Sequence, residues 1–158
     1  MPFLFRPGTG IFLRAKGRRS LTATIRFLED PGKRELDRIL ALYAANAWWS
    51  GPLDRVLAAR IVAGSHAFAV AEEDGSIIGM GRAISDRVSD AYIQDLTVDE
   101  RHRGRGIGTR LVRALVQRLN DDGLFWIALI AEKNSHPFYE PLGFSVMPDA
   151  VPMLRQGR

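Results

Sequence analysis

The residues whose types and spacing most clearly indicate chemistry form a short run of arginine and glycine, Arg103-Gly104-Arg105-Gly106-Ile107-Gly108. A strand pattern precedes this run and an amphipathic helix pattern follows it. Glycines lack a Cβ atom, so their backbone N–H groups can approach a ligand closely. N–H groups at the start of a helix also lie at the positive end of its dipole. The run is therefore predicted to hold an anion, most naturally a phosphate or pyrophosphate, with the arginines adding charge.

Three other phosphate or nucleic-acid motifs fit this run poorly. A P-loop requires Lys and then Ser or Thr after its last glycine, whereas Ile107 and Gly108 follow Gly106. A dinucleotide fingerprint would need glycine in place of Thr109 and a position near the first strand of the chain. An RNA-recognition strand would need aromatic residues around the Arg-Gly pair, and residues 94–110 contain no Phe, Tyr or Trp.

A second block further along the chain makes the pattern more specific. It reads Asn134-Ser135-His136-Pro137-Phe138-Tyr139-Glu140-Pro141-Leu142-Gly143-Phe144, and one helix plus one strand separate it from the first block. Together with the strand Asp95-Leu96-Thr97-Val98, the two blocks resemble the Gcn5-related N-acetyltransferase (GNAT) family. That family has the signature Arg/Gln-x-x-Gly-x-Gly/Ala followed later by Asn…Phe-Tyr-Glu-x-Leu-Gly-Phe. The resemblance covers about residues 22–147 and implies acetyl-CoA as cofactor.

The resemblance also implies which residues contact the coenzyme. The loop amides would bind its pyrophosphate, and the backbone of the preceding strand would pair with its pantetheine arm. Asn134 would hydrogen-bond that arm or cap the following helix, although Ser135 is an equal candidate for the cap. The residues expected at the cofactor are Leu96, Val98, Arg103, Gly104, Arg105, Gly106, Ile107, Gly108, Thr109, Asn134, Phe138 and Tyr139.

Three groups are candidates for the reaction itself. In similar enzymes a tyrosine at the position of Tyr139 protonates the departing thiolate, and a phenol is protonated at neutral pH. A purely structural alternative is that Tyr139 packs beside Phe138 and Phe144. Asp95 is the nearest ionisable candidate to accept a proton from the amine, or it fixes a loop. The backbone amide of Val98 is expected to polarise the thioester carbonyl.

The remaining chemically interesting residues have simpler interpretations. His66, His102 and His136 fit no metal-ligand spacing, the chain has no cysteine, and no metal site is expected. His102 is interpreted as a surface loop residue. Trp48 and Trp49 lie where similar proteins build the acceptor pocket, or they pack against the helix that precedes them. A set of acids is interpreted as a solvated face: Glu72, Glu73, Asp74, Asp86 and Asp90.

The charge of the chain supports a small anionic ligand better than a polymer. The net charge is +4, but residues 1–20 carry five basic and no acidic residues, and residues 101–120 carry six arginines and no acid. Everything else holds 11 bases and 18 acids. A nucleic-acid partner is therefore not expected. Residues 1–20 are interpreted as a poorly ordered basic extension, and residues 21–158 as one domain.

Hydrophobic periodicity predicts the elements that position these residues. Strands are expected at Thr22–Leu28, Ala67–Glu72, Ile77–Ile84, Ala91–Val98 and Trp126–Ala131, the last of them central in the sheet. Helices are expected over Leu36–Ala44, after Pro52, from Ile107 to Leu119, and near Pro137–Leu142, with an extended stretch from Phe144. This order predicts an α/β fold (an α+β mixed sheet), with a central mixed β-sheet flanked by helices.

The sequence therefore predicts a GNAT-like N-acetyltransferase that moves acetyl from acetyl-CoA to a primary amine by direct attack in a ternary complex. The alternative is a non-catalytic module that only binds an acyl-CoA. The acceptor is expected to be a small-molecule or peptide amine, and its identity stays open. No apolar run is long enough to cross a membrane, and a cytoplasmic location fits the lack of cysteine. The resemblance is also compatible with a homodimer.

Overall fold

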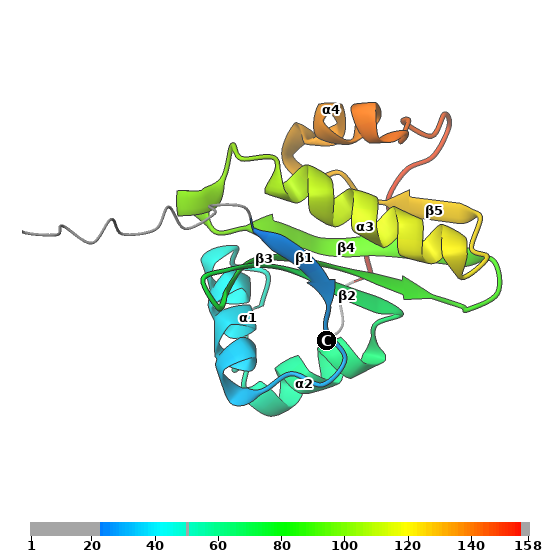
Figure 1. Cartoon of the computed structure of the whole chain (residues 1–158). Helices are drawn as coiled ribbons and strands as arrows, with labels where there is room; N and C mark the ends of the chain where they lie inside the picture. Colours follow the sequence, from blue (N-terminus) through cyan, green and yellow to red (C-terminus); the bar gives the residue numbers. More distant parts are fainter. Residues whose placement is uncertain (1–22, 50, 156–158) are drawn as a thin grey trace, which may run out of the picture.

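A computed structural model describes residues 23–49 and 51–155, and the expected N-terminal extension at residues 1–20 lies outside them. A five-stranded sheet has the order β1-β2-β3-β4-β5, in which β4 and β5 are parallel and the other neighbours antiparallel. Figure 1 shows α1 and α2 on one face and α3 on the other. The strands are β1 Thr24–Phe27, β2 Ala67–Glu73, β3 Ser76–Ser85, β4 Asp90–Val98 and β5 Trp126–Leu129. The helices are α1 Lys33–Ala45, α2 Arg55–Gly64, α3 Ile107–Asp121 and α4 His136–Tyr139, with 3-10 turns η1 Glu100–His102, η2 Glu132–Asn134 and η3 Glu140–Leu142.

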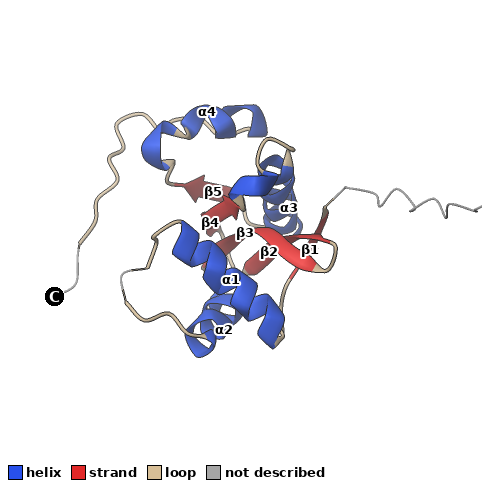
Figure 2. Ribbon diagram, turned by 90° about the vertical axis from the view of Figure 1, so that its left-hand side faces the viewer, coloured by secondary structure: helices blue, strands red, loops and turns tan. Residues whose placement is uncertain are grey.

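Alternation along the strands divides the core into two layers (Figure 2). In β2 the small residues Ala67, Ala69 and Ala71 pack toward α3, while Phe68 and Val70 pack toward α1 and α2. This two-residue period is what a strand buried on both faces requires. The predicted apolar stripe of α3 is confirmed, and its buried members are Ile107, Leu111, Val112, Leu115 and Leu119.

Helix α3 packs directly on β3 because β3 carries glycines beneath it. A Cβ atom at Gly79 would meet the side chain of Leu111 at 3.4 Å, and one at Gly81 would meet Leu115 at 3.2 Å. Larger residues would push the helix outward, since packed interiors leave little room for an added methyl group. The glycines of β3 thus set the distance between α3 and the sheet. This distance also sets the position of the loop that precedes α3.

The dipeptide Asp74-Gly75 forms the turn between β2 and β3. Asp74 and Gly75 both have positive φ angles, of 51° and 74°. Two such residues between paired antiparallel strands make the tight hairpin that an Asp-Gly sequence favours.

Two expectations about the C-terminal third are wrong. The strand predicted at Trp126–Ala131 ends at Leu129, and it pairs with β4 alone, so it lies at the edge of the described sheet and not at its centre. The stretch from Phe144 contributes no strand within the described residues. The apolar residues of β5 indicate that the strand contacts other apolar groups. A cavity with apolar walls beside an edge strand explains them as well as a central position in the sheet would.

The feature that shapes the site is the point where β4 and β5 part. Their register runs from Asp90–Trp126 to Ile93–Leu129, whereas β4 continues to Val98. Near this point β4 also bulges: Asp95 has a φ of +53°, and two residues of β4, Asp95 and Leu96, lie opposite one residue of β3, Gly81. A bulge bends the strand and redirects its side chains. The last residues of β4 therefore present a sheet edge that β5 does not cover.

No helix among residues 23–49 and 51–155 combines the length and the apolar character that a membrane crossing requires.

Candidate functional site

The glycine loop, defined as Arg103–Gly108, has the geometry that an anion site needs. Gly104 and Gly106 have φ angles of +74° and +73°, which disfavour side-chain-bearing residues, and a Cβ atom at either would meet nothing within 4 Å. Gly106 is the N-cap of α3 and offers no side chain to cap it. The first N–H groups of the helix consequently have no acceptor from a capping side chain. An anion at this position would meet these N–H groups and the helix dipole together.

Gly108 also has a packing role that the sequence did not indicate. A Cβ atom there would lie 3.3 Å from the ring of Phe138. Because Gly108 has no side chain, the ring of Phe138 in α4 can pack against the first turn of α3. Gly108 is needed for this packing, which also forms one wall of the site.

A groove of about 500 Å³ runs from the open edge of β4 to the glycine loop, and we call it the loop groove. Nine of the residues expected at the cofactor line it: Leu96, Val98, Arg103, Gly104, Gly106, Ile107, Gly108, Thr109 and Phe138. Sequence reasoning missed three others, Asn46, Thr97 and His102. Asn46 follows the last turn of α1 and donates to the Thr97 hydroxyl at 2.9 Å, which ties this helix end to β4. Nothing in the local sequence marks Asn46, because its partner is 51 residues away.

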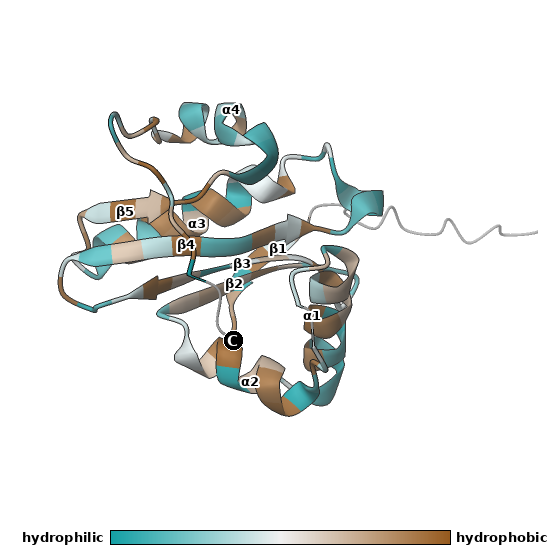
Figure 3. Cartoon of the chain, turned by 180° about the vertical axis from the view of Figure 1, so that it is seen from behind, coloured by the Kyte–Doolittle hydropathy of each residue, from teal (hydrophilic) through white to brown (hydrophobic). Residues whose placement is uncertain are grey.

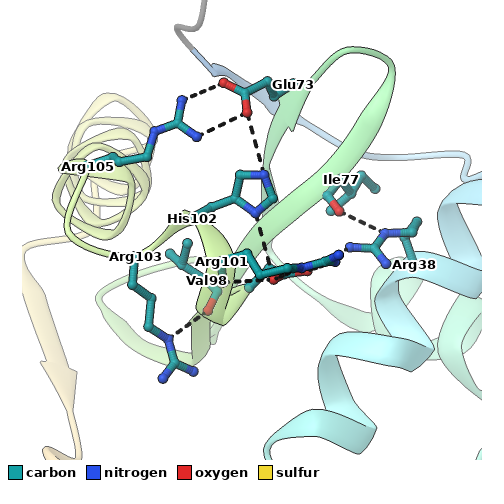
Figure 4. A network of polar contacts seen from close by, with 9 residues as sticks. Arg38, Glu73, Ile77, Val98, Arg101, His102, Arg103 and Arg105 are labelled. Carbon is teal, nitrogen blue, oxygen red and sulfur yellow. Dashed lines mark hydrogen bonds and ion pairs between the residues drawn. The ribbon is translucent and has the colours of Figure 1, made fainter.

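The backbone of Val98 is directed away from β3. Asp99 N–H donates to the carbonyl of Ile78 at 2.8 Å. Neighbouring residues in an antiparallel ladder alternate, so Val98, paired with Gly79, turns its own N–H and C=O to the other side. In agreement with this, the Val98 carbonyl accepts a hydrogen bond from Arg103 Nε at 3.0 Å (Figure 4). The Val98 amide is thus available at the edge that β5 leaves open.

The two arginines of the glycine loop are used differently. Arg103 binds the end of β4 and lines the loop groove. Arg105 turns toward Glu73 at the end of β2 and makes a two-pronged ion pair with it, at 3.0 and 2.5 Å (Figure 4). Arg105 is not among the residues that line the groove. Its charge is already balanced by a carboxylate, so it anchors the loop to the β2–β3 hairpin.

The interpretation of His102 and Glu73 as solvated surface residues is wrong. The side chain of His102 is 22% exposed and lies between two carboxylates, 3.6 Å from Glu73 and 3.7 Å from Asp99. Glu73 is 11% exposed, and the Arg105 guanidinium holds the pKa of Glu73 below its usual value. Figure 4 shows the contacts of Glu73 with Arg105 and with His102. Other acids that were assigned to the solvated face are also engaged: Glu72 pairs with Arg26, and Asp86 accepts hydrogen bonds from three backbone N–H groups.

Asp99 connects the end of β4 to the start of the loop. It caps η1 by accepting from the backbone N–H of Arg101 at 3.1 Å, and it also binds the guanidinium groups of Arg101 and Arg38. Its pKa lies well below the usual range, chiefly because of the hydrogen bond from Arg101. The carboxylate therefore favours the folded state above the unfolded pKa near 3.9, and this contribution is lost as the pH falls toward the lowered folded value.

Replacing Asp99 with Asn is expected to keep the cap and remove the charge. The free energy of unfolding at pH 7 should fall by up to about 1 kcal/mol, because the side-chain pairs are partly exposed. At pH 3 the difference from the wild type should shrink, because the Asp99 carboxyl of the unfolded chain takes up a proton below its pKa near 3.9 while the folded carboxylate stays ionised. Urea unfolding at both pH values measures this. An equal loss at both would contradict an electrostatic role for Asp99.

Tyr139 and Phe138 lie at the border between two cavities. Phe138 lines the loop groove, whereas Tyr139 lines a second, larger cavity on the far side of α4. The ring of Tyr139 makes edge-on contacts with Phe138 at 4.8 Å and with Phe144 at 6.0 Å between ring centres. Tyr139 is half-buried, and burial raises the pKa of its phenol above the usual value of 10. The aromatic packing considered above is present, and the hydroxyl keeps its proton at neutral pH.

The structure leaves Asn134 and Ser135 without the expected capping role. Asn134 is exposed in η2 and lines neither cavity. Ser135 is the N-cap of α4, but its side chain makes no capping hydrogen bond. The carbonyl of Ser135 instead accepts from the N–H of Phe138 at 3.0 Å.

Asp95 is held by two donors beneath the bulge of β4. The hydroxyl of the buried Tyr43 donates to Asp95 Oδ2 at 2.6 Å, and Arg82 Nε donates to the same oxygen at 2.5 Å. Burial, followed by the hydrogen bond to Asp95, raises the pKa of Tyr43 above its usual value. Tyr43 in turn contacts Trp48 edge-on at 6.1 Å, while Trp48 and Trp49 stay 36% and 42% exposed. Any proton-accepting role of Asp95 would fall to its other oxygen, Oδ1.

The fold and the site together define a class of protein. Its mixed sheet has a parallel pair of strands that parts beside a helix N-terminus without a capping side chain. The chain belongs to the acetyltransferase (GNAT) family, whose model matches residues 33–144. This agrees with the resemblance of its two sequence blocks, and it confirms the predicted fold class.

Individual relatives agree with this family. A histone acetyltransferase of Glycine max is 33% identical over 113 residues, which are 66% of this chain and 49% of the relative. A chloroplastic serotonin N-acetyltransferase of Oryza sativa is 36% identical over 77 residues, 49% of this chain and 38% of the relative. The matched region thus spans less than half the length of these curated relatives. A GNAT acetyltransferase structure from Streptococcus pneumoniae has 24% identity and a TM-score of 0.68, covering 86% of this chain and 98% of its own, and it shows the same fold.

Proposed function

We propose that the protein is an acetyl-CoA-dependent N-acetyltransferase that acts on a primary amine. The observation that carries this proposal is the loop groove. It joins an anion site at the glycine loop to an uncovered strand edge where the Val98 amide points outward. An elongated molecule with phosphates at one end and an amide-containing arm at the other would satisfy both parts. Acetyl-CoA has this form, and its thioester supplies an activated acetyl group.

The residues of the groove then have separate tasks. Backbone N–H groups at Gly106–Gly108 would bind the pyrophosphate, supported by the nearby charge of Arg103. The edge of β4 at Leu96–Val98 would pair with the amides of the arm, as a further strand would. The Val98 N–H would donate to the thioester oxygen, where negative charge develops during the reaction.

In the transfer step the amine nitrogen bonds to the carbonyl carbon and the carbon–sulfur bond breaks. The nitrogen loses one proton and the departing sulfur gains one, so no protein nucleophile is needed. The Tyr139 hydroxyl is the proposed donor to sulfur, because Tyr139 contacts Phe138, which lines the groove, and its raised pKa keeps the phenol protonated. Asp95 Oδ1 is the proposed acceptor of the amine proton, and the proton would pass through water because Asp95 lines neither cavity.

The experiment is to incubate the full chain with acetyl-CoA and a panel of amines and to follow free thiol release. We expect release that depends on both substrates, together with acetylated amine in equal amount. Acetyl-CoA binding without thiol release from any amine would contradict the proposal and favour a non-catalytic acyl-CoA-binding module. No binding of acetyl-CoA at millimolar concentration would contradict both.

A further inference from the structure

The second cavity, which we call the aromatic hollow, has a volume of about 670 Å³ and lies along the outer edge of β5. The segment after η3 closes its other side, through Met147 and Val151 among others. Figure 3 shows this segment descending across β5 and β4. The hollow is therefore bounded by the edge of the sheet, by α4 and by the segment that follows η3.

Exposed aromatic rings form the floor of the aromatic hollow. Tyr92 of β4 and Trp126 of β5 contact each other edge-on at 5.3 Å, yet they remain 40% and 43% exposed. Met147 and Val151 are 49% and 79% exposed on the opposite side. A concave site lined by this much uncovered apolar surface suits a ligand with an aromatic or apolar body.

The hollow reaches the proposed reaction centre from the side opposite the loop groove. Tyr139 lines the hollow and its neighbour Phe138 lines the groove, with their rings in edge-on contact. Two adjacent residues of α4 thus line the two neighbouring spaces. A molecule in the hollow would thus meet the same hydroxyl that is proposed to serve the sulfur of the coenzyme.

The aromatic hollow carries few ionisable side chains. Among its described lining residues Glu140 is the single carboxylate, and His136 is the only basic side chain. One carboxylate matches one ammonium group, whereas a polyamine or an aminoglycoside would place several ammonium groups against an apolar wall. Burying a charge without a partner is costly, so the lining selects against such acceptors.

We propose that the aromatic hollow is the acceptor site and that it takes a monoamine on an aromatic body, such as an arylalkylamine. This inference rests on the proposed function and names its substrate class. The ring of the acceptor stacks on Tyr92 and Trp126, and its single amino group lies near Glu140 and Tyr139. The deprotonated nitrogen bonds to the acetyl carbon, the carbon–sulfur bond breaks, and the two protons are balanced as described above.

The first part of the test compares acceptors with the full chain and acetyl-CoA: phenethylamine, tryptamine, butylamine, spermidine and a lysine-containing peptide. We expect kcat/KM for tryptamine and phenethylamine to exceed that for butylamine and spermidine by at least tenfold. Efficient transfer to spermidine or the peptide with poor transfer to the aromatic amines would overturn this inference and leave the proposed function intact. If no amine is acetylated, direct titration of tryptamine into the CoA-bound protein decides whether the hollow binds the amine, and no binding overturns the inference.

The second part uses a matched pair of tryptophan variants. Trp126→Ala should raise KM for tryptamine at least tenfold with little change in KM for acetyl-CoA, and Trp126→Phe should restore most of the loss. Trp49→Ala removes a tryptophan of equal exposure at the loop after α1, outside the hollow, and should change KM for tryptamine less than twofold. The opposite result, with Trp49 sensitive and Trp126 insensitive, would place the acceptor at the α1–α2 loop and refute the proposal. Unfolding midpoints of all three variants separate binding effects from loss of fold.

Discussion

Replacing Tyr139 with Phe is expected to lower kcat for acetyl transfer by about 10²–10⁴-fold, the usual contribution of a positioned general acid. The substitution removes one hydroxyl and keeps the ring that packs edge-on against Phe138 and Phe144. The affinity for acetyl-CoA should therefore change less than twofold. Steady-state thiol release and a direct acetyl-CoA titration on the same preparation measure the two quantities separately.

The dependence on pH gives a second readout for Tyr139 that simple packing would not affect. Burial raises the pKa of its phenol above 10, so the donor form persists through neutral and mildly alkaline pH. The ratio of wild-type to variant kcat should be constant between pH 7 and 9, and it should begin to fall only as the pH passes the raised pKa. A variant with unchanged kcat, or one that loses turnover and acetyl-CoA affinity together, would refute Tyr139 as the proton donor.

Much of the groove could be predicted because its residues are close together in sequence. The helix stripe from Ile107 to Leu119 and the glycine loop before it are local patterns, and local geometry decides where backbone N–H groups point. The loop side chains depend on distant partners. The sequence predicts that Arg105 binds phosphate, because its partner Glu73 lies 32 residues earlier and is not visible in the local pattern. The sequence likewise predicts a surface position for His102, because it does not show that Glu73 and Asp99 lie on either side of the ring.

The aromatic hollow was harder to predict, because it depends on the absence of a strand beside β5 in the described sheet. The apolar run at Trp126–Leu129 indicates contact with other apolar groups, and the sequence does not distinguish another strand from an open cavity. The bulge at Asp95 has a similarly non-local cause. A positive φ at a non-glycine residue inside a strand carries no sequence signal, and here the donors Tyr43 and Arg82 hold its side chain in place.

The most stringent test of the anion site is a pair of substitutions at Gly106. Gly106→Asp is expected to weaken acetyl-CoA binding by at least about 100-fold, because a carboxylate about 4 Å from a phosphate is repelled by roughly 4 kcal/mol at an effective dielectric constant near 20. The space around this position accepts a side chain, since nothing lies within 4 Å of a Cβ atom there.

The φ of +73° at Gly106 would strain most other residues, but Asp and Asn tolerate it best. Gly106→Asn is therefore the matched control: it has nearly the same shape and backbone cost as Asp, without the charge. The Asn variant should bind acetyl-CoA within about tenfold of the wild type, and added salt should narrow the gap between the two variants because it screens exposed charges. Equal affinities for the Asp and Asn variants would mean that the phosphates do not lie at the start of α3. The loop groove would then hold a ligand of another kind, or hold the coenzyme in another direction.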